Sequence, residues 1–286
     1  MTYDLLVLGT GPAGLSAAVT ARGRGKSVAV MGALPEDSPL ARAPEIDNYL
    51  GLPGMSGGEM LARFEEHARR AGAEFVRGRV VSLLTWESSV MATVGSQVYQ
   101  GRALILAPGV VRQNKYPGEE ALLGRGVSYC ATCDGMLYRG KAVVVAGRSP
   151  EAPTEANYLR SIGCKVTYVA PVRPEGLDEE IPFVPGNRLT VLGEGAVTGV
   201  ETGGQTIPCA GVFILRPAVA PADLLPGLTV ENGAIRTDRF MDTNLPGVFA
   251  AGDCTGLPHQ ISKAVGEGLT AALTACRYLD EKQKRA

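Results

Sequence analysis

The opening of the chain constrains its fold more than any other segment. A continuous apolar run at residues 3–8 predicts a buried strand, an alanine-rich stretch at 12–24 predicts a helix, and a second apolar run at 27–31 predicts another strand. The run GTGPAG at residues 9–14 lies where the first strand turns into the helix. This order of elements predicts a βαβ unit and an α/β fold built on a parallel sheet.

The three glycines of this turn match the pattern G-x-G-x-x-G, and each has a physical role. Gly9 permits the tight turn, Gly11 lets a pyrophosphate approach the backbone, and Gly14 allows the helix to pack closely on the strand. Pro12 and Ala13 begin the helix, whose free N–H groups and positive dipole end favour phosphate. The turn therefore predicts a dinucleotide site.

The acidic residue that usually completes such a site is not at its expected place. The second strand ends at Met31 and Gly32, and the nearest carboxylates, Glu36 and Asp37, come several residues later. A ribose hydroxyl thus has no partner at the usual position.

The length and a second strand–helix–strand pattern indicate two domains. At roughly 150 residues per domain, 286 residues suggest about two. Apolar strands at 142–145 and 165–169 flank a predicted helix at 154–162, which is a second βαβ start inside the chain. We therefore expect two Rossmann-like domains, the second inserted into the first.

The charge and composition exclude several classes of protein. The 28 Lys and Arg residues against 29 Asp and Glu give a net charge of −1, which lacks the basic footprint of a nucleic-acid binder. No apolar run reaches the roughly 18 residues of a membrane span, and the first strand does not resemble a signal peptide. We expect a soluble, cytoplasmic protein. Because His67 and His259 are the only histidines, a His-rich metal site is impossible.

Two of the six cysteines are paired by their spacing. Cys130 and Cys133 form a C-x-x-C motif that can close a small disulfide ring at a predicted helix start, where the dipole favours a thiolate. Without a second C-x-x-C, we expect no zinc site. Asp134 is placed to pass a proton to a leaving thiolate, or it is a solvated carboxylate. A structural disulfide remains the alternative for the pair. The other four cysteines are expected to be small buried side chains.

Further segments carry a resemblance to one known family. They are EIDNYLG at 45–51, ALILAPG at 103–109, GVSYCATCDG at 126–135, GVFAAGDC at 247–254, QI at 260–261 and GEG at 266–268. With the glycine turn, these segments resemble the low-molecular-weight thioredoxin reductases, flavoproteins with a redox-active dithiol, over nearly the whole chain.

The resemblance implies a cofactor, a domain division and roles for individual residues. FAD is expected on a discontinuous domain, residues 1–112 and 212–286, while residues 113–211 form the inserted domain with the cysteines. In this family the second cysteine lies against the flavin, which assigns electron uptake to Cys133, exchange with the substrate to Cys130 and proton donation to Asp134. The implied FAD-binding positions are Gly9, Gly11, Pro12, Ala13, Gly14, Asn48, Val80, Ala107, Gly109, Gly252, Asp253, Gln260 and Ile261.

The inserted domain departs from the family where NADPH would bind. The family's second glycine turn, GGGDSA, is replaced by AGRSPEAP at 146–153, so that Arg148 brings a long side chain and two prolines remove N–H groups. The family's arginine clamp for the 2′-phosphate is replaced by APVRPEG at 170–176, and apolar residues cannot bind an anion in its place. We therefore expect neither NADPH nor NADH to be used, and a filled groove near Arg148 would support this.

An intact dithiol without a hydride donor requires another source of electrons. The resemblance then narrows to the flavin-linked thioredoxin reductases that take single electrons from reduced ferredoxin, since FAD can accept electrons singly and deliver a pair. The expected partners are a ferredoxin or other one-electron donor, a thioredoxin-like protein and a second copy in a homodimer. The alternatives are an NADPH-dependent thioredoxin reductase with an atypical site, a dithiol oxidase and a flavin electron carrier without turnover.

Two basic clusters are candidate docking surfaces for an acidic ferredoxin. One follows the first helix, where cations also complement the helix dipole. The other follows the second predicted helix. The clusters are Arg22, Arg24 and Lys26, and Arg69, Arg70, Arg77 and Arg79.

Overall fold

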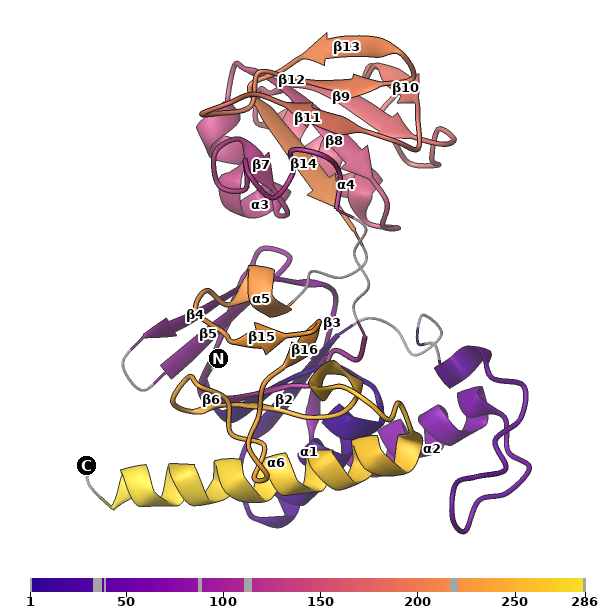
Figure 1. Cartoon of the computed structure of the whole chain (residues 1–286), viewed down its shortest axis with the longest axis vertical. Coiled ribbons are helices and arrows are strands. Elements are labelled where there is room, and N and C mark those ends of the chain that lie inside the picture. The colour runs from indigo at the N-terminus through magenta and orange to yellow at the C-terminus, as the bar shows by residue number, and fades with distance from the viewer. Residues whose placement is uncertain are drawn as a thin grey trace. The chain divides into compact units, whose positions relative to one another are not determined.

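The computed structural model describes residues 2–32, 38, 40–86, 89–110, 115–216 and 221–284. The chain divides into two compact units (Figure 1). The first unit contains Met1–Arg112 and Ala220–Ala286, and the second contains Gln113–Val219. Each unit has its own sheet, mixed in the first unit and parallel in the second, and its own core.

The first unit is built on a sheet in the order β3-β2-β1-β6-β5-β4, with β17 also paired to β6. The strands β3, β2, β1, β6 and β17 are parallel, whereas β5 pairs antiparallel with both β6 and β4. The bounds of the strands are β1 Thr2–Leu8, β2 Val28–Gly32, β3 Glu74–Arg77, β4 Val80–Trp86, β5 Ser89–Val94, β6 Gln97–Leu106 and β17 Val248–Ala250.

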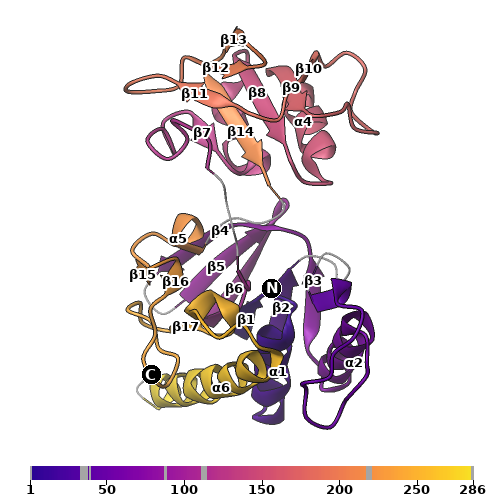
Figure 2. The same ribbon diagram turned by 45° about the vertical axis from the view of Figure 1, so that its right-hand side comes forward.

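Two helices cover the same face of this sheet. α1 (Pro12–Gly23) and α6 (Ile261–Gln283) run side by side along it (Figures 1 and 2). Small residues let them approach closely, since a Cβ on Gly268 would lie 2.1 Å from the carbonyl oxygen of Ala13. Their buried alanines join the apolar residues of β1 and β6 in one core.

α2 (Gly57–Arg70) packs beside α1 and begins with a capping box. The hydroxyl of Ser56 accepts the N–H of Glu59, whose carboxylate accepts the N–H of Ser56, so two N–H groups at the helix start are satisfied. The shorter elements of the unit are η2 Leu40–Arg42, α5 Pro221–Leu224, β15 Val230–Glu231, β16 Ala234–Ile235 and η4 Asp253–Thr255.

The second unit has a parallel sheet in the order β10-β9-β8-β14-β7 and a separate antiparallel sheet, β11-β12-β13. α4 (Ala152–Ser161) and α3 (Ala131–Asp134) pack on one face of the parallel sheet, and β12 contacts β14. The remaining bounds are β7 Val127–Ser128, η3 Gly135–Tyr138, β8 Ala142–Gly147, β9 Lys165–Ala170, β10 Phe183–Pro185, β11 Thr190–Leu192, β12 Gly199–Thr202, β13 Gln205–Pro208 and β14 Gly211–Leu215.

The predicted class, α/β with two Rossmann-like domains, is confirmed, and the position of the second domain boundary differs from the prediction. Within residues 74–86, Gly78 separates β3 from β4 with a φ of +136°. The expected return to the first domain at residue 212 falls inside β14, which pairs with β8 and so belongs to the second unit. The structure therefore places this boundary after Val219.

Candidate functional site

Three strands of the first unit end together at the glycine turn. The N–H of Ala107 donates to the carbonyl of Leu8 (2.7 Å), and the N–H of Ala251 donates to that of Leu106 (2.9 Å), so the ends of β1, β6 and β17 lie side by side. Gly9, with a φ of +124°, passes so close that a Cβ on it would lie 2.0 Å from the carbonyl oxygen of Ala107. This edge is where open α/β sheets bind their ligands.

The next glycine of the turn faces open space. Gly11 is the N-cap of α1, and a Cβ added to it would meet no protein atom within 4 Å. Gly14 is the opposite case, since its Cβ would lie 2.0 Å from the carbonyl oxygen of Gly9. The turn is thus tight where helix meets strand and open at the N-terminus of α1, where a pyrophosphate would approach. These residues fit a dinucleotide.

The segment GVFAAGDC brings a second loop against the same helix. A Cβ on Gly252 would lie 2.8 Å from the Cβ of Ala13, so the loop packs directly on the start of α1. α6 anchors this loop through two side chains. Glu267 accepts the N–H of Gly252 (2.8 Å), and Lys263 donates to the carbonyls of Gly252 (3.0 Å) and Gly256 (2.9 Å). Asp253 therefore lies on a loop that α6 holds through the backbone of Gly252 before it and of Gly256 after it.

Other predicted flavin residues gather in the same unit. The Asn48 amide donates to Gln260 Oε1 (3.0 Å), although 212 positions separate them, and Gln260 is the N-cap of α6, which starts at Ile261. Gly109 follows β6 with a φ of +72°. Val80 begins β4 with a buried side chain. Flavin contact at each of these positions stays a prediction.

Glu36 and Asp37, the carboxylates that follow the second strand, lie outside the described residues. The structure therefore gives no position for the acidic residues nearest to the expected ribose contact.

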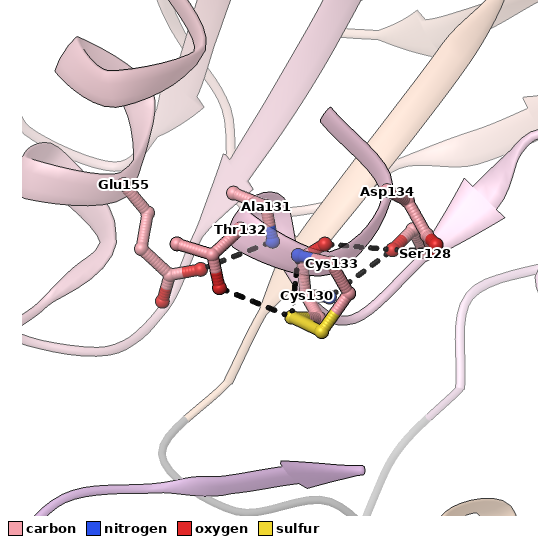
Figure 3. Close-up of a disulfide and its surroundings, with 7 residues drawn as sticks. All are labelled: Ser128, Cys130, Ala131, Thr132, Cys133, Asp134 and Glu155. Carbon is pink, nitrogen blue, oxygen red and sulfur yellow. Dashed lines mark hydrogen bonds between the residues drawn. A yellow bond between two sulfur atoms is a disulfide. The ribbon is translucent and has the colours of Figure 1, made fainter. Parts of the chain in front are cut away.

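The C-x-x-C pair forms a disulfide at the start of the short helix α3 (Figure 3). Cys130 is the N-cap, and its Sγ accepts the N–H of Cys133 (3.1 Å) and lies 3.4 Å from the hydroxyl oxygen of Thr132. Cys130 is only 5% exposed, whereas Cys133 is exposed. Within the described residues of its own unit, Cys133 is therefore the more exposed residue of the pair.

A buried serine connects the pair to Asp134. Ser128 Oγ donates to Asp134 Oδ2 (2.7 Å) and accepts the N–H of Cys130 (3.1 Å). Asp134 is thus linked through Ser128 to the backbone of Cys130, and in Figure 3 its carboxylate lies on the side of Ser128 away from the sulfur atoms. A role of Asp134 in proton transfer stays a prediction.

The remaining cysteines are buried thiols, as expected. Burial raises the pKa of Cys254 to about 12 and that of Cys209 to about 11, and it also raises the pKa of Cys164 and of Cys276. A thiol that stays protonated is a poor nucleophile. The structure thus separates these four from the disulfide pair.

The altered turn of the second unit is filled by an arginine. From the end of β8, the guanidinium of Arg148 donates to the carbonyls of Gly147 (2.7 Å) and Val169 (3.1 Å), and its Nε donates to the Tyr116 hydroxyl (2.8 Å). It also donates to the carbonyls of Gly186 (3.3 Å) and Asn187 (3.4 Å). The side chain thus covers the carboxyl ends of β8, β9 and β10.

Gly147, the remaining glycine of that turn, has no free space beside its Cα. A Cβ on Gly147 would lie 1.8 Å from the hydroxyl oxygen of Tyr168, a buried residue of β9. The glycine is required here by a protein side chain rather than by an approaching ligand.

A buried ion pair holds Tyr116 and Tyr129, the residue that precedes Cys130. Glu119, fully buried, is paired with Arg216 (2.6 Å) and accepts the Tyr129 hydroxyl (2.9 Å) and the N–H of Tyr116 (2.7 Å). Burial alone would raise the pKa of Glu119, but Arg216 and these hydrogen bonds hold it below its ordinary value.

Several members of the basic clusters contact their own unit. Arg22 donates to the carbonyl of Ala71 (3.2 Å), and Lys26 pairs with Asp280. Arg69 and Arg77 both pair with Glu65, and both stack on Phe75. The clusters therefore have structural roles, and docking there stays a prediction.

Sequence reasoning missed four residues that hold the site. Ser128, Glu155, Lys263 and Glu267 each contact a predicted site residue or its immediate neighbour. Lys263 and Glu267 form an i,i+4 ion pair on α6, a spacing that could have pointed to them. Ser128 lies within the segment 126–135, only two positions before Cys130, so its place beside the pair could have pointed to it. Glu155 gave no comparable signal, because its contact with Ala131 spans 24 positions.

Among the described residues, no three His, Cys, Asp or Glu side chains are grouped to hold a metal ion. None of the described helices combines the length and apolarity needed to cross a membrane.

A dinucleotide-binding unit joined to a unit with an accessible disulfide defines a flavin-dependent disulfide oxidoreductase. The pattern of the pyridine nucleotide-disulphide oxidoreductase family matches residues 3–268, and the chain belongs to that family. The chain is 34% identical to a thioredoxin reductase of Bacillus subtilis, over 99% of this chain and 96% of that protein. It is similarly 34% identical to a thioredoxin reductase of Listeria innocua, over 98% and 94%.

Solved structures show the same relationship. A ferredoxin-flavin thioredoxin reductase from Clostridium acetobutylicum is 39% identical with a TM-score of 0.90, covering 98% of this chain and 99% of that chain. The atypical thioredoxin reductase TRi from Desulfovibrio vulgaris Hildenborough is 32% identical with a TM-score of 0.74, covering 97% and 98%. The chain is thus a flavoprotein of the thioredoxin reductase type, and its cofactor is FAD.

Proposed function

We propose that this protein reduces the disulfide of a thioredoxin-like protein with electrons from a one-electron donor such as ferredoxin, and not from NADPH. The observation that carries the proposal is Arg148, whose guanidinium binds four backbone carbonyls at the carboxyl edge of the second unit's sheet. That edge is where a pyridine nucleotide binds in a fold of this class. A similar structure from Clostridium acetobutylicum, described as a ferredoxin-flavin thioredoxin reductase, agrees with this choice of donor.

The first unit would hold FAD with the residues described above. The open face of Gly11 and the N-terminus of α1 suit its pyrophosphate, and Asp253, fixed through Lys263 and Glu267, suits its ribityl chain. When bound, FAD takes up electrons one at a time and releases them as a pair, which matches a one-electron donor to a two-electron disulfide.

The protein's own residues then carry out the exchange. Reduction of the disulfide breaks the bond between Cys130 and Cys133 with two electrons. The N–H of Cys133 and the hydroxyl of Thr132 are positioned to stabilise a thiolate on Cys130. Asp134, whose carboxylate accepts the hydroxyl of Ser128, would supply or take up the proton of the exchange. A thiolate attacks the partner's disulfide, and the second cysteine resolves the mixed disulfide, which leaves the partner with two thiols.

The assignment of attack to Cys130 and of electron uptake to Cys133 requires Cys130 to become accessible, because its side chain is buried in the disulfide form. Met136 and Leu137, two exposed apolar side chains of η3 close to Cys133 in the chain, suit contact with a protein partner. Resemblance alone supports a homodimer.

A steady-state assay tests the proposal. The holoenzyme is mixed anaerobically with oxidised thioredoxin and either reduced ferredoxin or NADPH, and thioredoxin thiols are counted over time. We expect turnover with ferredoxin and none with NADPH. Cys130→Ser should abolish turnover while flavin reduction by ferredoxin continues. Turnover with NADPH would refute the choice of donor, and oxygen consumption with small dithiols but no thioredoxin reduction would indicate a dithiol oxidase.

A further inference from the structure

A carboxylate from α4 is positioned at the redox pair without belonging to its motif. Glu155 reaches from α4 to the start of α3, where its Oε2 accepts the N–H of Ala131 at 3.3 Å (Figure 3). Ala131 directly follows Cys130 and is fully buried. Glu155 lies in the first turn of its own helix as well, so its negative charge stands near two helix N-termini.

The first N–H groups of α3 are divided between this carboxylate and the sulfur. The N–H of Ala131 goes to Glu155, while the N–H of Cys133 goes to Cys130 Sγ (3.1 Å). In Figure 3, the Thr132 hydroxyl, 3.4 Å from that sulfur, lies on the side where Glu155 approaches. Negative charge on Glu155 therefore opposes the helix dipole at the place where a thiolate on Cys130 would need it.

This arrangement has a thermodynamic consequence for the pair. A group that destabilises the thiolate destabilises the reduced form relative to the disulfide, and the couple becomes a stronger reductant. Cys130 and Ala131 are buried and Glu155 is half-buried, so water screens the charge of Glu155 only in part.

We propose that Glu155 is a positioning residue that holds the first turn of α3 and keeps the Cys130–Cys133 couple strongly reducing. Electrons on the pair are thereby favoured to pass to a partner's disulfide. The inference rests on the redox activity of the pair and is independent of whether ferredoxin or NADPH supplies the electrons.

Equilibration of the holoenzyme with dithiothreitol tests this proposal. Dithiothreitol gives up two electrons and two protons and closes to its cyclic disulfide, while the Cys130–Cys133 bond breaks to two thiols. After an acid quench and denaturation, a thiol label counts the product, because reduced protein has six free cysteines and oxidised protein has four. The label count against the dithiothreitol ratio gives the equilibrium constant.

Glu155→Gln keeps the shape and an acceptor oxygen but removes the charge. We expect its equilibrium constant for reduction to rise about three- to tenfold, and tenfold corresponds to about 30 mV for this two-electron couple. Glu155→Ala should change the constant in the same direction, and Glu155→Asp, which retains the charge, should keep the wild-type value.

The matched control is Glu151→Gln, which removes an exposed carboxylate four positions earlier, at the N-cap of α4. It should leave the constant unchanged. An unchanged constant in both uncharged Glu155 variants, or an equal rise in Glu151→Gln, would overturn the proposal. A purely structural role would lower the melting temperature without moving the constant. Failure of the ferredoxin assay would not affect this result, because dithiothreitol is the only donor used.

Discussion

In each unit a buried strand turns into a helix at the carboxyl ends of parallel strands, after β1 in the first unit and after β8 in the second. The first turn keeps Gly11 with no protein atom within 4 Å of an added Cβ. In the second turn, Tyr168 fills the space beside Gly147, and Arg148 binds the surrounding carbonyls. The same backbone plan thus leaves space for a ligand in one unit and is filled by protein side chains in the other.

The difference lies in two side chains. Tyr168 occupies the space beside Gly147, and Arg148 donates to carbonyl groups at the ends of the neighbouring strands. The disulfide on α3 is carried by the same unit, and its contacts with Ser128 and Thr132 do not involve the filled turn.

The largest effect is expected from filling the open turn of the first unit. Gly11→Leu, at a φ of −85° that any residue adopts, should leave the unit folded but lower FAD affinity on the order of a thousandfold, about 4 kcal/mol. Titration of the apoprotein with FAD measures this affinity. Gly23→Leu, at the other end of α1 and equally open, is the control. Wild-type FAD affinity in Gly11→Leu would show that the open space at the first turn is not used by the cofactor, and the difference between the two turns would then have no functional meaning.

The ion pair beneath Tyr116 should give the next effect. Glu119→Gln leaves Arg216 buried without its charge partner and should cost about 3 kcal/mol of unfolding free energy at pH 7. Because the folded pKa of Glu119 lies below its ordinary 4.5, the stabilisation is complete above pH 4.5 and is lost as pH falls through the folded pKa.

Denaturant unfolding followed from neutral to acid pH checks this prediction. The variant should depend less on pH than the wild type below pH 4.5. Equal slopes in the two proteins would show that Glu119 does not stabilise the fold through its charge.

Removing the arginine should weaken the second turn without restoring a site. Arg148→Ala leaves carbonyl groups at the sheet edge without a donor and should cost about 2 kcal/mol of unfolding free energy. Arg188→Ala, at an exposed position of the same unit, is the control. NADPH should still not reduce the flavin, because Pro150 and Pro153 still lack N–H groups. Rapid reduction by NADPH in Arg148→Ala would mean that the arginine alone blocks a working site.

The smallest effect concerns the loop that completes the first site. Lys263→Met removes donors to the carbonyls of Gly252 and Gly256 and should lower FAD affinity about tenfold, or about 1.4 kcal/mol. Lys282→Met, at the far end of α6, should leave it unchanged. Equal losses in both variants would indicate a general effect of charge on α6.

Local features of the chain could be predicted from its sequence, and features that depend on distant contacts could not. The turn at Gly9 and the pair Cys130–Cys133 are contained in a few consecutive residues, so spacing alone identified them. The boundary at residue 212 was wrong because β14 is assigned by its pairing with β8, far away in the sequence. Glu155 was missed because its contact with Ala131 spans 24 positions.

Anaerobic flavin reduction decides whether the second unit has a functional pyridine nucleotide site. Purified holoenzyme is mixed in a stopped-flow instrument with excess NADPH, NADH or reduced ferredoxin, and flavin absorbance is followed. We expect bleaching by ferredoxin and none by either nucleotide. Rapid bleaching by NADPH or NADH would show that the second unit has a working nucleotide site.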